Sequence, residues 1–223
     1  MTDELWPGGP RFRDDVDGFP LGGDSLLLAQ FAKGSRVRKK RVADLGCGAG
    51  IVSILLAWNE PNVHIDGIEI RHLAASLAAE NIEVNGFSDR ISIIEGDIRR
   101  HRELFSAGAY DMVVSNPPYY KQGSGKRPES ADISTARSED CCTFADICSA
   151  AGYLTRNGGA FVIVHKPERL VEIFRTLTNH GFEPKRAKFV HHTETAPPSL
   201  VLIESRRAGK PSLEIEPPSL RGA

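Results

Sequence analysis

Excess positive charge is the first property that this sequence lacks. Its 28 Lys and Arg are balanced by 29 Asp and Glu, which leaves a formal net charge of -1 over 223 residues. That balance excludes the strongly basic class of histone-like or ribosomal nucleic-acid binders. Any contact with a polyanion must therefore be local.

Paired cysteines are lacking as well. The four cysteines are Cys47, Cys141, Cys142 and Cys148, and none has the CxxC spacing of a zinc or redox site. We therefore expect a reduced, cytoplasmic protein without a resident metal.

Long apolar runs are absent too. The start, Met1-Thr-Asp-Glu-Leu-Trp-Pro7, has no basic segment followed by an apolar core, and no stretch of about 18 apolar residues occurs. We expect a protein that is neither secreted nor membrane-spanning. Its length suits one α/β domain with short extensions, since domains run to about 100–200 residues, and we expect a monomer or a weak homodimer.

Short aliphatic runs alternate with longer helical patterns from residue 41 onward. This alternation predicts parallel βα units in a sheet with helices on both faces. The predicted strands are Arg41–Leu45, Val63–Ile68, Arg90–Glu95, Tyr110–Ser115 and Ala160–Val164, and the predicted helices are Ile51–Asn59, Leu73–Gly86 and Glu168–His180.

The last third of the chain has a different pattern. Lys188–His192 and Leu200–Glu204 predict an antiparallel end to the sheet, and the proline-bearing Lys210–Ala223 predicts an irregular tail. The polar segment between Tyr120 and Asp140 is too long for an ordinary connection, so it is either a substrate loop or disordered.

A glycine-rich loop closes the first predicted strand. Asp44 precedes Gly46, Gly48 and Gly50, so bare backbone lies where α/β sheets bind their ligands. Ile51 stands where a dinucleotide fingerprint needs its third glycine, which disfavours NAD. No Gly-Lys-Ser/Thr follows, so a Walker-type phosphate loop is disfavoured as well.

Two acids end the next two predicted strands. Glu69 lies about 20 residues beyond the glycine loop, a position from which a carboxylate can accept both hydroxyls of a ribose. Asp97 follows Gly96, where a short acid can reach an adenine amino group. Each acid alone is more often a solvated strand end. Together with the loop they predict a nucleotide-type ligand at one edge of the sheet.

The tetrapeptide Asn116-Pro117-Pro118-Tyr119 follows the fourth strand. The Asn116 side-chain carbonyl and the Pro117 carbonyl offer two adjacent acceptors, and the ring of Tyr119 offers a flat face for a base. The prolines stiffen the turn. The motif is typical of a clamp for a planar amino group, although Asn-Pro-Pro alone often only ends a strand.

Taken together, these motifs resemble the Rossmann-like S-adenosylmethionine-dependent methyltransferases with an Asn-Pro-Pro-Tyr motif. The segment Phe19–Ala32 is similar to the cofactor-capping segment of the family that methylates adenine N6 in the anticodon loop of a valine tRNA. Three later stretches are also similar to that family, although Ser138 stands where relatives tend to have a histidine. These stretches are Thr135–Glu139, His165–Leu170 and Glu183–Arg186.

The resemblance implies a mostly parallel seven-stranded sheet with an antiparallel C-terminal strand. It implies a cofactor-capping extension over residues 1–40, a methyltransferase domain over 41–206 and an irregular tail over 207–223. S-adenosylmethionine is the implied cofactor, held by Gly23, Asp24, Asp44, Gly46, Gly48, Gly50, Glu69, Asp97, Ile98 and Asn116.

The implied acceptor is the exocyclic N6 amine of an adenine in RNA, and tRNA is the favoured RNA. Asn116, Pro117 and Tyr119 would be catalytic, with Tyr120 as an alternative stacking residue, and the adenosine would have to leave its stack. Lys121, Lys126, Arg127 and Arg137 would contact phosphates. We interpret the basic run Arg36–Arg41 as a solvated loop instead.

Three other functions stay open at this point. A protein glutamine N5-methyltransferase uses the same motif, but such enzymes carry a large helical domain before the glycine loop, and only 43 residues precede Asp44 here. Other RNA or DNA amino-methyltransferases, for example on guanine N2, fit because the motif does not distinguish the base. A silent cofactor-binding or RNA-binding module is the third.

Overall fold

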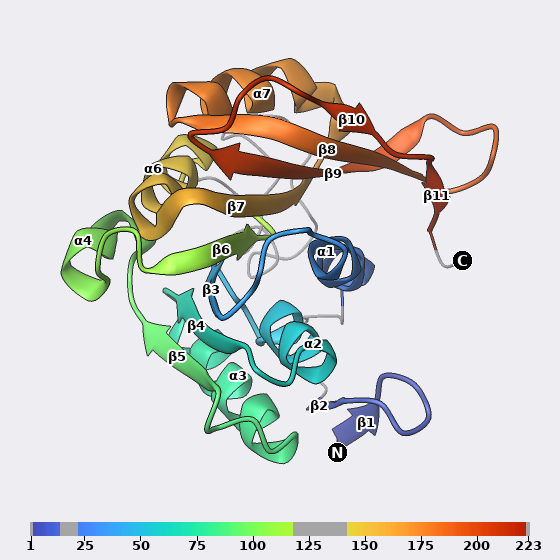
Figure 1. Ribbon diagram of the computed structural model, residues 1–223. Coiled ribbons are helices and arrows are strands. Elements are labelled where there is room, and N and C mark those ends of the chain that lie inside the picture. The colour runs from blue at the N-terminus through green and yellow to red at the C-terminus, as the bar shows by residue number, and fades with distance from the viewer. Residues whose placement is uncertain (1, 14–21, 118–141, 222–223) are drawn as a thin grey trace.

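A nine-stranded sheet with helices on both faces forms the body of the protein (Figure 1). The computed structural model describes residues 2–13, 22–117 and 142–221. The strand order is β10-β8-β9-β7-β6-β3-β4-β5, and β11 pairs with β8 off this path. The seven long strands are β3 (Arg41–Leu45), β4 (His64–Glu69), β5 (Ile91–Glu95), β6 (Tyr110–Ser115), β7 (Thr155–His165), β8 (Phe182–His191) and β9 (Pro198–Arg207).

Most neighbouring strands in this sheet run parallel. β3 pairs in parallel with β4 and β6, β4 with β5, and β6 with β7. β9 is antiparallel to both β7 and β8. The predicted α/β class is thus confirmed, with a mostly parallel sheet, seven long strands and an antiparallel strand near the end of the chain.

Helices bury their apolar sides against the two faces of the sheet. On β6, Met112 and Val114 belong to a core cluster with α1 and α2, whereas Val113 belongs to the opposite cluster with α6 and α7. This alternation follows from the two-residue period of a strand, and it explains why the strands read as continuous apolar runs. The helices are α1 (Gly23–Lys33), α2 (Ile51–Asn59), α3 (His72–Val84), α4 (His101–Leu104), α6 (Phe144–Leu154) and α7 (Leu170–Asn179), with 3-10 turns η1 (Ile98–Arg100) and η2 (Pro167–Arg169).

Helix α6 and an N-terminal hairpin are absent from our sequence-based predictions. The hairpin pairs β1 (Thr2–Glu4) with β2 (Arg11–Arg13), and β2 packs on α3. Helix α6 begins with a capping box, in which Thr143 Oγ1 accepts from the Asp146 backbone N–H and the Asp146 side chain accepts from the Thr143 N–H. Thr-x-x-Asp before an apolar segment was therefore the available signal.

The tail is more regular than its proline content predicts. β10 (Glu214–Ile215) and β11 (Ser219–Leu220) both pair in parallel with the edge strand β8. The prediction of an irregular tail is wrong at these four residues, because the unpaired backbone groups of a sheet edge favour the addition of another strand.

A buried ion network joins α1 to the end of the sheet. Glu204 on β9 is fully buried and accepts hydrogen bonds from Ser35 Oγ at 2.9 Å, from Arg186 at 2.5 Å and from Arg206 at 3.2 Å. The Arg186 guanidinium also lies 4.3 Å from the ring centre of Phe31 on α1. The network therefore holds α1 against β8 and β9.

Removing one partner of this network is expected to destabilise the fold strongly. Arg186→Ala leaves the Glu204 carboxylate buried with weaker compensation, which costs about 3 kcal/mol of unfolding free energy. Chemical denaturation measures this loss. Arg175→Ala on the exposed side of α7 is the matched control and should change stability by less than about 0.5 kcal/mol. Equal values for the two variants would contradict this account.

Candidate active site

The glycine loop turns the chain sharply between β3 and α2. Gly46 and Gly48 have φ values of 73° and 54°, in the left-handed region that favours glycine. A Cβ built on either residue meets no atom within 4 Å, so open space lies beside this part of the backbone. The N–H groups of Gly46 and Cys47 both donate to the Ile68 carbonyl, which ties the loop to β4. The loop therefore presents bare backbone at the carboxyl edge of the sheet.

Glu69 joins this loop to the end of β4. Its side chain is buried, and Oε2 accepts from the Gly48 N–H at 3.0 Å. Oε1 accepts from the backbone N–H and from Nε of Arg71, both at 3.0 Å. The carboxylate thus lies at the predicted place, but it also orders the glycine loop, a role that its position in the sequence does not indicate.

Asp44 lies under the loop and is almost completely buried. Ser53 on α2 donates to Oδ2 at 2.7 Å. Burial raises the pKa of Asp44 to about 7, partly offset by the hydrogen bonds from Ser53 and reinforced by the negative charge of Glu69. A cationic ligand near the loop would favour the ionised form.

Asp97 follows β5 and begins the 3-10 turn η1. Its Oδ1 accepts from the Arg99 N–H at 2.9 Å, and its two oxygens pair with the Arg99 guanidinium at 2.5–3.0 Å. The hydrogen bond from Arg99 holds the pKa of Asp97 below its usual range. The next residue, Ile98, packs against the core cluster of α6 and α7. The contact of Asp97 with an adenine amine stays a prediction.

Asn116 directly follows β6 and meets the first turn of α1. Its Nδ2 donates to Ser25 Oγ at 3.2 Å, and Pro117 beside it is buried. Ser115 Oγ donates to the Leu45 carbonyl at 2.7 Å, which ties this turn to the end of β3. The structure thus brings Gly23 and Asp24 in the first turn of α1 near Asn116 and the glycine loop. Ser25 contacts a predicted site residue, and our sequence analysis did not identify it.

Asp24 is paired with the C-terminal tail. Its Oδ1 accepts from Arg221 Nη2 at 2.6 Å, across 197 positions of sequence. The Arg221 backbone N–H donates to the His191 carbonyl on β8. No sequence pattern indicated this pair, since it depends on the pairing of the tail with β8.

Several predicted site residues lie outside the described residues. They are Tyr119, Tyr120, Lys121, Lys126, Arg127 and Arg137, together with Ser138 and the segment between Tyr120 and Asp140. Among residues 2–13, 22–117 and 142–221, no group of three or more His, Cys, Asp or Glu has the arrangement of a metal site. Nor does any helix of those residues have the length and apolarity to cross a membrane.

A family comparison agrees with this arrangement. The model of the methyltransferase small domain matches residues 19–183, which include α1, the glycine loop, Glu69, Asp97 and Asn116. The chain belongs to the methyltransferase small-domain family.

Among curated proteins, this chain is similar to two relatives that carry the same name. It is 33% identical over 163 residues to the tRNA1(Val) (adenine(37)-N6)-methyltransferase of Yersinia pseudotuberculosis serotype O:3 (strain YPIII), across 73% of this chain and 63% of the relative. The protein of the same name from Yersinia pestis (strain Pestoides F) is also 33% identical, with 64% of that relative covered. The chain therefore spans just under two thirds of these relatives.

Solved structures confirm the Rossmann-like methyltransferase fold. A predicted O-methyltransferase from Agrobacterium tumefaciens superposes with a TM-score of 0.70 at 21% identity, covering 90% of this chain and 89% of that one. A geranyl diphosphate methyltransferase in complex with SAM gives a TM-score of 0.59 at 12% identity, over 82% of this chain and 84% of that one.

The raised pKa of Asp44 has a consequence for stability. Burial raises it from 3.8 to about 7, so the folded protein holds a proton that the unfolded chain releases between these values. This contribution to stability is complete below about pH 4 and is lost as the pH rises through about 7. Between about pH 5 and pH 8 it amounts to a loss on the order of 3 kcal/mol.

Asp44→Asn removes the titrating group while keeping its shape. Denaturant unfolding of both proteins at about pH 5 and about pH 8 isolates the Asp44 contribution as the difference between their pH dependences. The wild type should lose more stability than the variant over this interval. The same loss in both proteins would mean that Asp44 has an ordinary pKa.

Proposed function

We propose that this protein is an S-adenosylmethionine-dependent methyltransferase that modifies the exocyclic N6 amine of an adenine in tRNA. The observation that carries the proposal is the contact between Asn116 and Ser25, beside the glycine loop. This contact supports the proposal because it holds the Asn116 amide at the first turn of α1, in a chain with relatives named as tRNA1(Val) (adenine(37)-N6)-methyltransferases.

The residues at the carboxyl edge fit S-adenosylmethionine. The open space beside Gly46 and Gly48 allows a ligand to approach the backbone closely. Glu69 and Asp44 supply buried carboxylates next to it, suited to ribose hydroxyls and to a positively charged ligand. Helix α1 would cap the cofactor through Gly23 and Asp24. When bound, S-adenosylmethionine supplies a methyl group on a sulfonium, a strong electrophile.

The polypeptide supplies positioning and polarisation. The lone pair of adenine N6 is delocalised into the ring, so the amine is a weak nucleophile. Asn116 Oδ1 and the Pro117 carbonyl would accept the two N6 hydrogens and localise that pair toward the methyl carbon. Because Ser25 Oγ accepts from Asn116 Nδ2, it fixes which end of the amide is the donor and which is the acceptor. Tyr119 would stack on the base.

The transfer requires no strong base in the site. Held in line by Asn116 and the Pro117 carbonyl, N6 would take the methyl group in one displacement, with the C–S bonding pair leaving on sulfur. The methylated ammonium would be acidic and would give its extra proton to solvent. The site would therefore act mainly by positioning the amine, which suits a motif of two carbonyl acceptors and an aromatic ring.

Asn116→Ala tests the clamp directly. Losing an acceptor that acts in the transition state should lower kcat by at least about a hundredfold, whereas affinity for S-adenosylmethionine should stay within about threefold. Transfer of labelled methyl to an unmodified tRNA transcript measures the first effect, and a cofactor titration measures the second.

Two further variants make this test specific. Ser25→Ala removes the hydrogen bond that Asn116 Nδ2 donates and should lower kcat with a smaller effect, while cofactor affinity is unchanged. Asn62→Ala, in an exposed turn before β4, is the matched control and should behave as wild type. Normal turnover by Asn116→Ala would disprove the clamp role.

A further inference from the structure

A cavity lies at the edge of the sheet opposite the candidate active site. It has a volume of about 590 Å³, within the range of small-molecule sites. Gly108 before β6, Thr155 at the start of β7 and His180 before β8 all line it. These are the amino ends of parallel strands, whereas Asn116 follows the carboxyl end of β6. The two sites are therefore separated by roughly 20 Å, the length of a six-residue strand.

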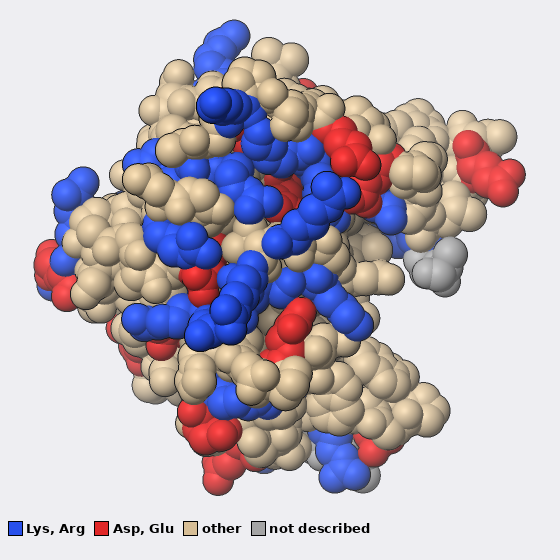
Figure 2. Space-filling model, in the orientation of Figure 1, with Lys and Arg blue, Asp and Glu red and all other residues tan. Residues whose placement is uncertain are grey.

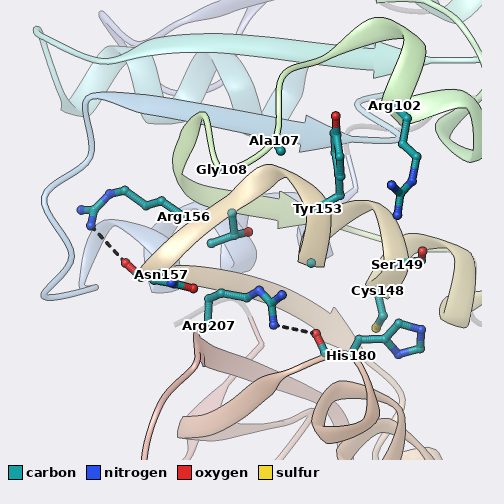
Figure 3. Close-up of a pocket in the computed structure, with 12 residues that line it drawn as sticks. Arg102, Ala107, Gly108, Cys148, Ser149, Tyr153, Arg156, Asn157, His180 and Arg207 are labelled. Atoms are coloured by element: carbon teal, nitrogen blue, oxygen red, sulfur yellow. Dashed lines mark hydrogen bonds between the residues drawn. The ribbon is translucent and has the colours of Figure 1, made fainter.

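Basic side chains from separate elements surround this cavity (Figure 3). Arg102 comes from α4, Arg156 from β7, His180 from the end of α7 and Arg207 from the end of β9. The residues that line the cavity include no Asp or Glu. Lys and Arg also gather across the middle of the face seen in Figure 2, over β3, β6 and β7. The cavity is thus suited to an anion.

The three arginines of the cavity differ in whether a carboxylate compensates their charge. Arg156 pairs with Asp111 at 2.6 Å. In contrast, neither Arg102 nor Arg207 has a carboxylate partner within the part of the chain that the structure describes. Arg102 only stacks on the ring of Tyr153, 4.9 Å from its centre. Arg207 Nη1 donates to the carbonyls of His180 and Gly181, both at 3.2 Å, which aims the guanidinium while leaving its net charge uncompensated.

The position of Arg207 depends on a glycine. Gly181 has a φ of 77°, and a Cβ built there would collide with the Arg207 guanidinium. β7 also has a bulge here. Tyr110 on β6 pairs with Thr155, but Met112, two residues later, pairs with Ala160. The bulge brings Arg156 and Asn157 to the cavity. Bulges are common next to functional sites because they redirect side chains.

Arginine forks are the donors that phosphate oxygens prefer. Thr155 forms part of the cavity wall, but its Oγ1 is buried behind that wall and has no hydrogen-bond partner among the described residues. The hydroxyl therefore does not reach a ligand in the cavity, and Arg102 and Arg207 are the available donors.

We propose that this cavity binds a phosphate group through Arg102 and Arg207. The phosphate comes either from a free phosphate-containing anion or from the backbone of a bound RNA. An RNA that reached both edges of the sheet would be anchored here while its base occupied the clamp at Asn116. The proposal goes beyond methyl transfer and does not require it.

Two probes without a methylatable amine test the proposal on the whole protein. Inorganic phosphate is titrated against chloride at constant ionic strength, with thermal unfolding as the readout. A labelled decauridylate, whose bases lack an exocyclic amino group, is titrated by fluorescence anisotropy. The variant is Arg102→Ala, which leaves the Arg207 contacts intact, and Arg36→Ala in the loop before β3 is the matched control.

We expect Arg102→Ala to weaken binding about tenfold, the loss of one hydrogen bond to a charged group, while Arg36→Ala has little effect on phosphate. Weakened phosphate binding identifies a free anion as sufficient, and weakened decauridylate binding alone identifies the RNA backbone. Wild-type affinity of Arg102→Ala for both probes would overturn the proposal. Because neither probe can be methylated, this result is independent of the proposed enzyme activity.

Discussion

Parallel pairing of β3 with β4 and with β6 is the constraint on which the candidate active site depends. It brings the ends of three strands to one edge, so Asp44, Glu69 and Asn116 lie together although they are far apart in sequence. Glu69 then stabilises this edge, because its carboxylate accepts hydrogen bonds from both the Gly48 N–H and Arg71 Nε. The glycine loop keeps its open shape through this contact and the left-handed glycines.

Helix α1 completes the candidate site, and some of the contacts that hold this helix lie far from Asn116. The buried Glu204 network and the stacking of Arg186 on Phe31 hold the C-terminal end of α1 against β8 and β9. The N-terminal end of the same helix supplies Ser25 to Asn116 and Asp24 to Arg221. Packing at one end of α1 therefore determines where its first turn lies relative to the clamp.

Local patterns were sufficient for much of the fold. β3, α2 and β6 have the predicted bounds, because short apolar runs bounded by glycine or polar residues leave few alternatives. Helix α6 was not predicted, since the small residues Ala150, Ala151 and Gly152 obscure the helical repeat of its large apolar side chains. Strands β10 and β11 exist only because β8 offers an edge, which no local pattern records.

The candidate site, like the fold, was predictable only in part. Strand-end positions predicted the neighbourhood of Glu69 and Asn116, because topology alone brings them together. The partners of these side chains could not be predicted, since Arg71, Ser25 and Arg221 are placed by tertiary packing. The cavity around Arg102 and Arg207 could not be predicted either, because its residues come from elements scattered between residues 102 and 207.

Methylation of a tRNA adenine is the central claim, and nucleoside analysis tests it most directly. Mass spectrometry of total tRNA and rRNA from cells with and without the gene should find N6-methyladenosine lost from a single tRNA when the gene is absent. Unchanged RNA, together with loss of methylation from a protein glutamine amide, would contradict the account.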